Sequence, residues 1–254
     1  MKRPLLTAAG SMLGVMLAVL PMNDLRAAEL KMLAGGSMAG LLNELAPQFE
    51  RTSGYKLVIH FDSTPNLIKQ ATSGAAFDLG LVPIDVMKDQ TARARFATGP
   101  TTDVARVGYG IAVRAGAPKP DVSTSAALKK TLLDAQSIAY IPASAAGAYV
   151  SSVFERLGIA EAMKAKTKTQ TTPAQIPQAV ANGEAELGVF VVSVLMAPGV
   201  ELAGSFPSEL QQELVFSAAV AADTKEAEAA KAFIDYLTSP AVSAMIKAKG
   251  MTPG

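Results

Sequence analysis

The stretch "LAGGSMAG", residues 33–40, lies between a short apolar run and a helical pattern, and it decides how the chain is interpreted. Gly35 and Gly36 let backbone amides approach a bound group closely, and Ser37 places a hydroxyl at the start of the following helix. Amides at a helix start carry partial positive charge, so such a turn favours an anion. The stretch therefore predicts an anion-binding turn between a strand and a helix.

Two further stretches repeat this arrangement. "FDSTPNL", residues 61–67, and "PASAAGAY", residues 142–149, each carry small or hydroxyl residues where a strand-like run meets a helical pattern. Ligands of open α/β sheets bind beyond the carboxyl ends of the strands. We therefore expect the three turns to converge on one binding site.

Strand-like runs alternate with amphipathic helical stretches along most of the chain, which is typical of parallel sheets flanked by helices. Two such series are long enough for two α/β lobes with separate cores. We place the first lobe at residues 29–107 plus 218–254 and the second at residues 108–217.

The N-terminus has the pattern of an export signal. Two basic residues near the start are followed by an apolar run that ends near Met22, and then by Ala27 and Ala28. The pattern predicts a signal peptide over residues 1–27, cleaved near Ala27 or Ala28, and hence a periplasmic protein. A single membrane anchor is the alternative, but the run is near the lower limit for a span. The chain has no cysteine, which excludes disulfides and a lipidated cysteine.

Charge and motifs exclude several classes of function. Removing the signal peptide changes the formal net charge from +1 to −1, which argues against nucleic acid and anionic membranes as partners. The sequence contains no HExxH, CxxC or P-loop pattern, and "GGSMAG" does not match the GxSxG of serine hydrolases. We expect no metal and no cofactor.

Several stretches together resemble the periplasmic solute-binding proteins of the molybdate-binding type, within the type II periplasmic binding protein superfamily. The resemblance rests on "LAGGSMAGLLNELAPQFERTSG", "FDSTPNLIKQATSGAAFDLGLVP", "PASAAGAY", "NGEAELGV" and "AAKAFIDYLTSPAVSAMIKAKGM". It implies an α/β fold of two lobes joined by a two-strand hinge, with a small anionic ligand in the cleft. It also implies a membrane ABC-type permease as partner, and we expect a monomer.

The resemblance also implies particular ligand contacts. They are Gly36, Ser37, Ser63, Thr64, Ala146 and Gly147. Molybdate binders carry a tyrosine after the strand that corresponds to "LGVFVVS", residues 187–193, where this chain has Val191. Loss of a hydroxyl from a dehydrated oxyanion site is unfavourable, so an organic carboxylate is favoured over molybdate.

"DVARVGYGIAVRAGAPKP", residues 103–120, resembles a branch of the family that includes periplasmic aconitate isomerases. In this branch Arg106 would lie near the point where the chain passes from one lobe to the other, and its guanidinium would bind a carboxylate. The same geometry would suit a transport receptor for an organic acid, so the resemblance leaves receptor and enzyme open.

Two functions are therefore carried forward: a transport receptor for a small anion, and a cofactor-independent aconitate isomerase. The isomerase needs a base, and the candidates are His60, Asp62 and Tyr149. Each has a simpler interpretation: His60 as a partly buried strand residue, Asp62 as a turn-bonding residue, and Tyr149 as a packing residue of the second lobe. Helix capping would likewise explain Ser37 and Thr64 without a ligand. Because no base is compelling, the sequence favours the receptor.

Overall fold

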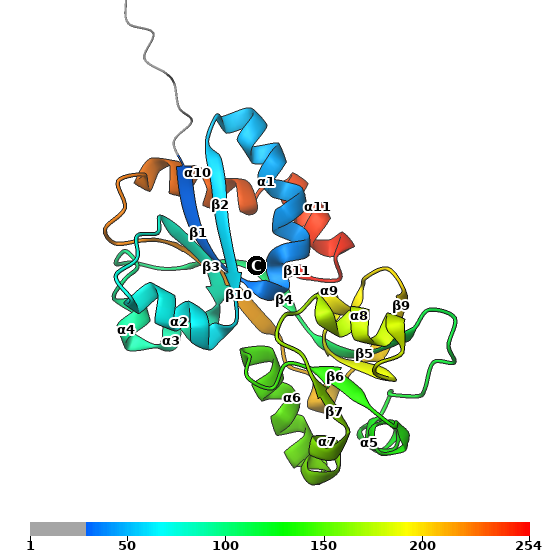
Figure 1. Ribbon diagram of the computed structural model, residues 1–254. Helices are drawn as coiled ribbons and strands as arrows, with labels where there is room; N and C mark the ends of the chain where they lie inside the picture. Colours follow the sequence, from blue (N-terminus) through cyan, green and yellow to red (C-terminus); the bar gives the residue numbers. More distant parts are fainter. Residues whose placement is uncertain (1–28) are drawn as a thin grey trace, which may run out of the picture.

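The computed structural model describes residues 29–254, and the predicted signal peptide with its cleavage point near Ala27 or Ala28 lies outside them. Figure 1 shows two lobes, each built on its own β-sheet with helices around it. The chain begins in the first lobe, passes to the second and returns to the first, where it ends. The two-lobed α/β architecture predicted from the sequence is confirmed.

The first lobe contains a six-stranded sheet in the order β11-β4-β10-β3-β1-β2. Its strands are β1 (Glu29–Gly35), β2 (Lys56–Asp62), β3 (Leu79–Pro83), β4 (Thr102–Val107), β10 (Leu214–Val220) and β11 (Thr252–Pro253). β1 pairs in parallel with β2 and β3, as expected where helices connect successive strands. β10 is antiparallel to β3 and β4 because it returns from the second lobe, so the sheet is mixed rather than purely parallel.

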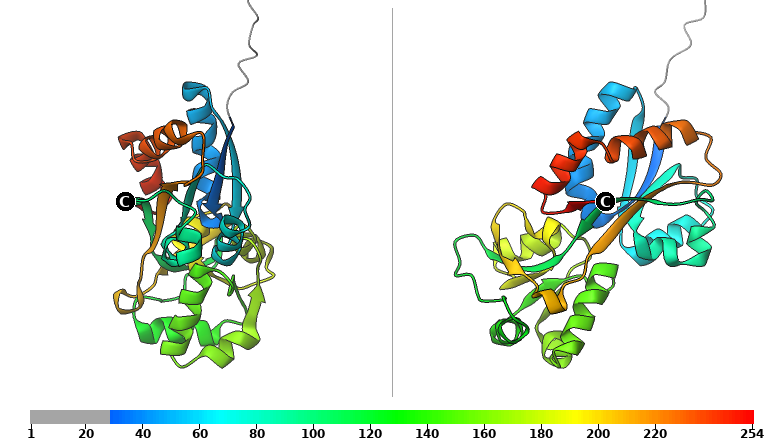
Figure 2. Two further views of the ribbon diagram at one scale, coloured as in Figure 1. Left: turned by 90° about the vertical axis from the view of Figure 1, so that its left-hand side faces the viewer. Right: turned by 180° about the vertical axis from the view of Figure 1, so that it is seen from behind.

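Helices cover both faces of this sheet. One face carries α1 (Ala39–Ser53), α10 (Ala227–Leu237) and α11 (Pro240–Ala248), and the other carries α2 (Thr64–Thr72), α3 (Ile84–Lys88) and α4 (Gln90–Arg93). Figure 2 shows α11 beside α1 on the first of these faces. A hydrophobic core lies on each face of this sheet, and alternate residues of β1 point into the two cores. Met32 and Ala34 are buried in one core, and Leu33 is buried in the other.

The second lobe contains a five-stranded sheet in the order β7-β6-β8-β5-β9. Its strands are β5 (Tyr109–Arg114), β6 (Ile138–Tyr140), β7 (Thr167–Thr169), β8 (Leu187–Val191) and β9 (Val200–Ser205). Its helices are α5 (Ser125–Asp134), α6 (Ala145–Arg156), α7 (Ala160–Lys166), α8 (Gln175–Asn182) and α9 (Val192–Leu195). β6 is parallel to β7 and β8, whereas β5 is antiparallel to β8 and β9.

Two chain segments connect the lobes. On the way out, only Gly108 separates β4 of the first sheet from β5 of the second. On the way back, β10 joins the first sheet from Leu214 onward, whereas the boundary expected from the sequence lies at residue 218. The side chain of Gln211 accepts a hydrogen bond from the Tyr109 amide at 2.7 Å and donates one to the Tyr109 carbonyl at 3.0 Å. Gln211 therefore ties the two connections together at the hinge.

Candidate ligand-binding site

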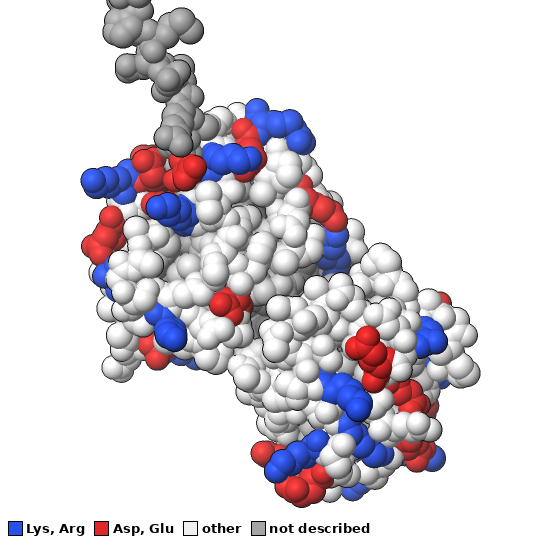
Figure 3. Space-filling model, viewed as in Figure 1, with Lys and Arg blue, Asp and Glu red and all other residues white. Residues whose placement is uncertain are grey.

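A cavity of about 650 Å³ lies between the two lobes. The first lobe lines it with the turns after β1 and β2 and with side chains of β10, and the second with the start of α6, the segment before α8, and α9. Polar lining residues include Ser37, Ser63, Thr64, Ser144, Thr171, Thr172, Gln178 and Ser193. Apolar lining residues include Phe61, Ile141, Phe190, Leu214 and Phe216. Figure 3 shows a mostly uncharged surface beside the division between the lobes on this face.

The turn after β1 brings the chain to the cavity through two glycines. A Cβ on Gly35 would lie 2.8 Å from the ring of Phe216 on β10, so a larger residue there would require this ring to move. A Cβ on Gly36 would lie 3.2 Å from Pro173 of the second lobe, so the lobes approach each other closely at this point. Ser37 follows in a 3-10 turn and lines the cavity, and its hydroxyl caps no helix in the described part of the chain.

The start of α2 presents Ser63 and Thr64 to the cavity. Ser63 occupies the N-cap position, but its hydroxyl accepts no capping hydrogen bond from α2. Thr64 is only 8% exposed, and its hydroxyl is bonded to no described residue. Helix capping, which would explain these hydroxyls without a ligand, is therefore not how the structure uses them.

The start of α6 behaves differently. Ser144 caps this helix: its Oγ accepts a hydrogen bond from the Gly147 amide at 2.9 Å and donates to the Ile141 carbonyl, also at 2.9 Å. Ala146 lines the cavity, whereas Gly147 does not. A Cβ on Gly147 would lie 1.6 Å from the Ile141 carbonyl oxygen. Gly147, predicted as a ligand contact, thus gives its amide to the cap and is required for packing.

Arg106, which the sequence predicts to bind a carboxylate, is not among the residues that line the cavity. Its guanidinium pairs with Asp103 at 3.0 Å. On the sheet, Arg106 lies opposite Val215, whereas the cavity is lined by the two neighbours of that residue, Leu214 and Phe216. Successive residues of a strand point to opposite faces, so the register turns Arg106 away from the ligand site.

Two of the three candidate bases also lie outside the cavity lining. The Tyr149 hydroxyl donates to the Leu210 carbonyl at 2.8 Å, and its ring centroid lies 4.7 Å from that of Tyr109. Tyr149 is therefore a packing residue of the second lobe. The side chain of His60 is 57% exposed, which corrects the expectation of partial burial. The reason is that β2 is an edge strand of the first sheet.

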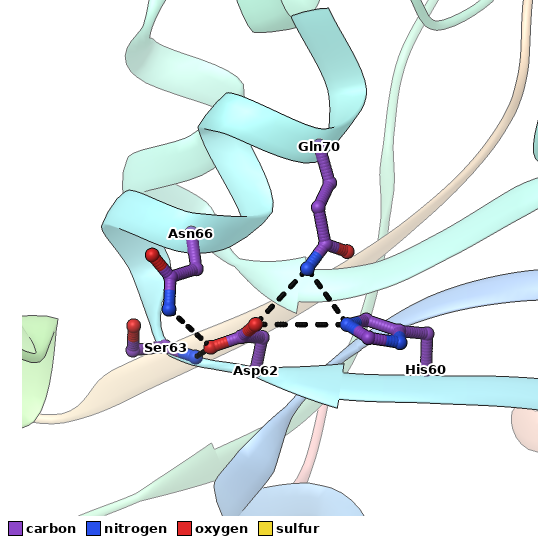
Figure 4. A network of polar contacts seen from close by, with 5 residues as sticks. All are labelled: His60, Asp62, Ser63, Asn66 and Gln70. Atoms are coloured by element: carbon purple, nitrogen blue, oxygen red, sulfur yellow. Dashed lines mark hydrogen bonds and ion pairs between the residues drawn. The ribbon is translucent and has the colours of Figure 1, made fainter. Parts of the chain in front are cut away.

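The third candidate, Asp62, lines the cavity, and several donors hold its carboxylate (Figure 4). Its Oδ1 accepts hydrogen bonds from the Ser63 amide at 2.7 Å and from the Asn66 side chain at 2.8 Å. Its Oδ2 accepts one from Gln70 at 3.0 Å and lies 3.6 Å from Nε2 of His60.

These contacts decide the charge of Asp62. Burial by itself raises the pKa of this carboxyl, but the hydrogen bonds from Asn66 and the Ser63 amide, together with His60, outweigh burial and hold the pKa below its ordinary value. Asp62 is therefore ionised at neutral pH. A carboxylate stabilised in this way is a weak proton acceptor.

Sequence analysis missed an ion pair in the cavity lining. Glu44 of α1 pairs with Lys249, which follows α11, and both residues line the cavity. Lys249 is the only basic residue among the described residues that form the lining. No local motif predicts this pair, since its two members are 205 positions apart in the chain.

Sequence analysis also missed Ser193 of α9. This residue lines the cavity, and its Oγ is buried without a hydrogen-bond partner among the described residues. Val191, where the molybdate-binding pattern has a tyrosine, is fully buried and does not line the cavity. The second lobe therefore offers a hydroxyl two residues further along the chain.

The chemistry of the lining suits a small anion with an apolar part. Hydroxyls and helix-start amides supply hydrogen-bond donors, Lys249 supplies a positive charge, and aromatic and aliphatic side chains form the rest of the wall. In the described part of the chain, no group of three or more His, Cys, Asp or Glu side chains could hold a metal ion. Within residues 29–254, no helix is both long enough and apolar enough to span a membrane.

Residues 30–252 match the family of bacterial extracellular solute-binding proteins. The chain belongs to this family. Among its relatives, an aconitate isomerase from a Pseudomonas species is 33% identical over 232 residues, which cover 88% of this chain and 87% of the relative. The molybdate-binding protein ModA of Azotobacter vinelandii is 29% identical over 231 residues, which cover 89% of this chain and 90% of ModA. The resemblance stated from the sequence is confirmed.

Solved structures agree with this assignment of the fold. The periplasmic molybdate-binding protein of Azotobacter vinelandii superimposes with a TM-score of 0.73 and 21% identity, covering 88% of this chain and 98% of that protein. This solute-binding protein therefore has the two-lobed fold with a ligand cleft between the lobes.

Proposed function

We propose that this protein is a periplasmic receptor that binds a small organic carboxylate between its lobes and delivers it to an ABC-type permease. The proposal is carried by one observation: among the described residues, a cavity of about 650 Å³ is lined from both lobes by hydroxyls that include the unpartnered Ser193, and by the cation of Lys249. Membership of the solute-binding family supports the role of receptor. In this role the protein acts as a monomer.

One carboxylate of the ligand lies at the converging turns. Ser37 and Thr64 donate their hydroxyls from the first lobe, and the Ala146 amide donates from the start of α6 in the second. Each donor then forms a charge-assisted hydrogen bond, and the helix starts add favourable partial charge. Ser63 and Gly36 complete the wall around this carboxylate.

In this proposal Lys249 binds a carboxylate of the ligand, which is the role that the sequence predicted for Arg106. Its ammonium group pairs with Glu44 of α1, and the Lys249 side chain is 30% exposed, so a ligand can reach it. An incoming carboxylate that displaces Glu44 exchanges one anion for another without leaving the ammonium unpaired. This favours an acid with more than one carboxylate.

The size and character of the cavity favour an organic acid over molybdate. Ligand pockets of about 300–1,000 Å³ commonly hold organic molecules rather than single tetrahedral ions. Phe61, Phe190 and Phe216 line the space and suit a carbon skeleton. A tetrahedral oxyanion would leave these apolar side chains without contacts.

The test is a melting-temperature screen of the mature protein with molybdate, tungstate and a panel of mono-, di- and tricarboxylates. A ligand that binds only the folded state adds about 2.7 kcal/mol of stability at a hundredfold excess over its Kd. We expect di- or tricarboxylates to give the largest shift. A dominant shift with molybdate or tungstate, with carboxylates inactive, would contradict the proposal.

The second candidate function is that of a cofactor-independent aconitate isomerase. The 33% identity between this chain and the Pseudomonas aconitate isomerase favours it. The reaction removes a proton from the methylene carbon of the bound acid and returns a proton to the vinyl carbon, which moves the double bond. The acids that line the cavity, Asp62 and Glu44, are the candidates for this base. The lowered pKa of Asp62 opposes that role and favours the receptor.

Incubation of the purified protein with cis-aconitate and with trans-aconitate separates the two functions. Conversion of many equivalents per protein, lost in Asp62→Asn or Glu44→Gln, would make the protein an enzyme. Saturable binding of either isomer without conversion is the result that we expect of the receptor.

A further inference from the structure

Ser193 of the second lobe carries a hydroxyl that no described residue uses. Ser193 is one of the residues that line the cavity, and its Oγ is buried without a hydrogen-bond partner in the described part of the chain. A buried hydroxyl without a partner is unfavourable, and most such groups in folded proteins are bonded. Ser193 therefore calls for a partner that enters the cavity.

Local bonding does not explain this serine. Serines in helices often donate to a carbonyl three or four residues earlier, and two serines of α6 do so. Ser151 donates to the Gly147 carbonyl at 2.9 Å, and Ser152 donates to the Tyr149 carbonyl at 2.7 Å. Ser193 makes no such bond within the described residues, because it is the second residue of α9 and the carbonyls three and four positions earlier belong to β8.

The surroundings of Ser193 connect it to the cation of the first lobe. α9 packs against the turn that carries Lys249: a Cβ on Gly250 would lie 3.0 Å from Val192 and 2.5 Å from the Met196 sulfur. Ser193 lies between these two residues in the chain, and both Ser193 and Lys249 line the cavity. Ser193 and Lys249 therefore belong to segments of the two lobes that pack against each other beside the cavity.

We propose that Ser193 is a ligand-binding residue that donates its hydroxyl to a second carboxylate of the bound acid, beside Lys249. This inference rests on the proposed function, and it narrows the ligand class to acids with at least two carboxylates. One carboxylate is held by the converging helix starts, and the other joins α9 of the second lobe to Lys249 of the first.

The experiment measures the Kd of trans-aconitate and of tricarballylate for wild type, Ser193→Ala, Ser193→Cys and Ser208→Ala, together with the melting temperature without ligand. Ser193→Cys keeps the size of the side chain but offers only a weak donor. Ser208 is exposed, lies outside the cavity lining and serves as the control.

We expect both Ser193 variants to weaken binding on the order of tenfold or more, since a hydrogen bond to a charged group is lost. The melting temperature of unliganded Ser193→Ala should stay the same or rise, because an unpaired buried hydroxyl is removed. Ser208→Ala should change neither quantity.

Unchanged affinity in Ser193→Ala, or affinity restored by Ser193→Cys, would overturn the inference and leave Ser193 as a packing residue. If neither acid binds to the wild type, the proposed function itself fails. The two failures are therefore distinguishable, because the wild type is measured with the same acids.

Discussion

The starts of α2 and α6 look alike in sequence but use their hydroxyls in opposite ways. At α6, Ser144 accepts a hydrogen bond from the Gly147 amide and so satisfies its own helix. At α2, Ser63 and Thr64 cap nothing, and both line the cavity. The first arrangement stabilises the fold, and the second leaves donors available for a ligand.

The two helix starts differ in where the hydroxyl proton goes. The Ser144 hydroxyl accepts from its own helix and donates to the Ile141 carbonyl, so its donor is already used, whereas no described residue accepts a hydrogen bond from Ser63 or Thr64. Asp62 helps to decide the outcome at α2. Its carboxylate accepts the hydrogen bond from the Ser63 amide and one from Asn66, so the first turn of α2 is held without the hydroxyls. An acidic residue just before the helix thus releases the hydroxyls that follow it.

The largest expected effect is a loss of stability when Gly147 is replaced. Gly147→Ala places a Cβ 1.6 Å from the Ile141 carbonyl oxygen, a backbone atom that cannot move aside as a side chain can. We expect a loss of about 3 kcal/mol or more in the free energy of unfolding, measured by urea denaturation. Gly40→Ala is the control, because a Cβ there meets nothing within 4 Å and alanine favours the helix. Equal stability of the two variants would break the assignment of Gly147 to structure.

The next prediction compares hydroxyls that line the cavity without capping a helix with the hydroxyl of Ser144, which caps α6. Ser37→Ala and Thr64→Val should each weaken carboxylate binding by about 1.5–3 kcal/mol while leaving the stability of the unliganded protein nearly unchanged. Ser144→Ala should do the reverse and cost about 1 kcal/mol of stability through loss of the cap. Calorimetric titration and thermal unfolding of the same samples measure both quantities. Equal losses of stability in all three variants would contradict the distinction between ligand-binding and helix-capping hydroxyls.

The smallest effect concerns pH. The pKa of Asp62 is lowered in the folded state, so its contribution to stability is complete above the ordinary value of 3.8 and is lost as pH falls through the lowered one. The difference in melting temperature between wild type and Asp62→Asn should therefore shrink as the pH falls below the ordinary value of 3.8 and through the lowered pKa of this carboxyl. Asn66→Ala, which removes one donor, should give a smaller change of the same kind. A difference that does not vary with pH would contradict this account.

The fold and the converging turns were predictable because they depend on local patterns. Alternation of strand and helix patterns gives the two lobes, and small residues before a helix mark the turns. The orientation of Arg106 was not predictable, since it depends on how β4 aligns with β10. Lys249 was missed because its partner lies on a distant helix, and Ser193 because burial without a partner is a property of the folded protein.

The central claim is that the interlobe cavity binds a small organic carboxylate through the hydroxyls of the first lobe. Its most direct test is calorimetric titration of wild type and of the double variant Ser37→Ala/Thr64→Val with trans-aconitate, tricarballylate and molybdate. We predict that a carboxylate binds to the wild type with one site per chain, that the double variant loses this binding while remaining folded, and that molybdate gives no heat. Binding of molybdate alone, or carboxylate binding that survives in the double variant, would contradict the claim.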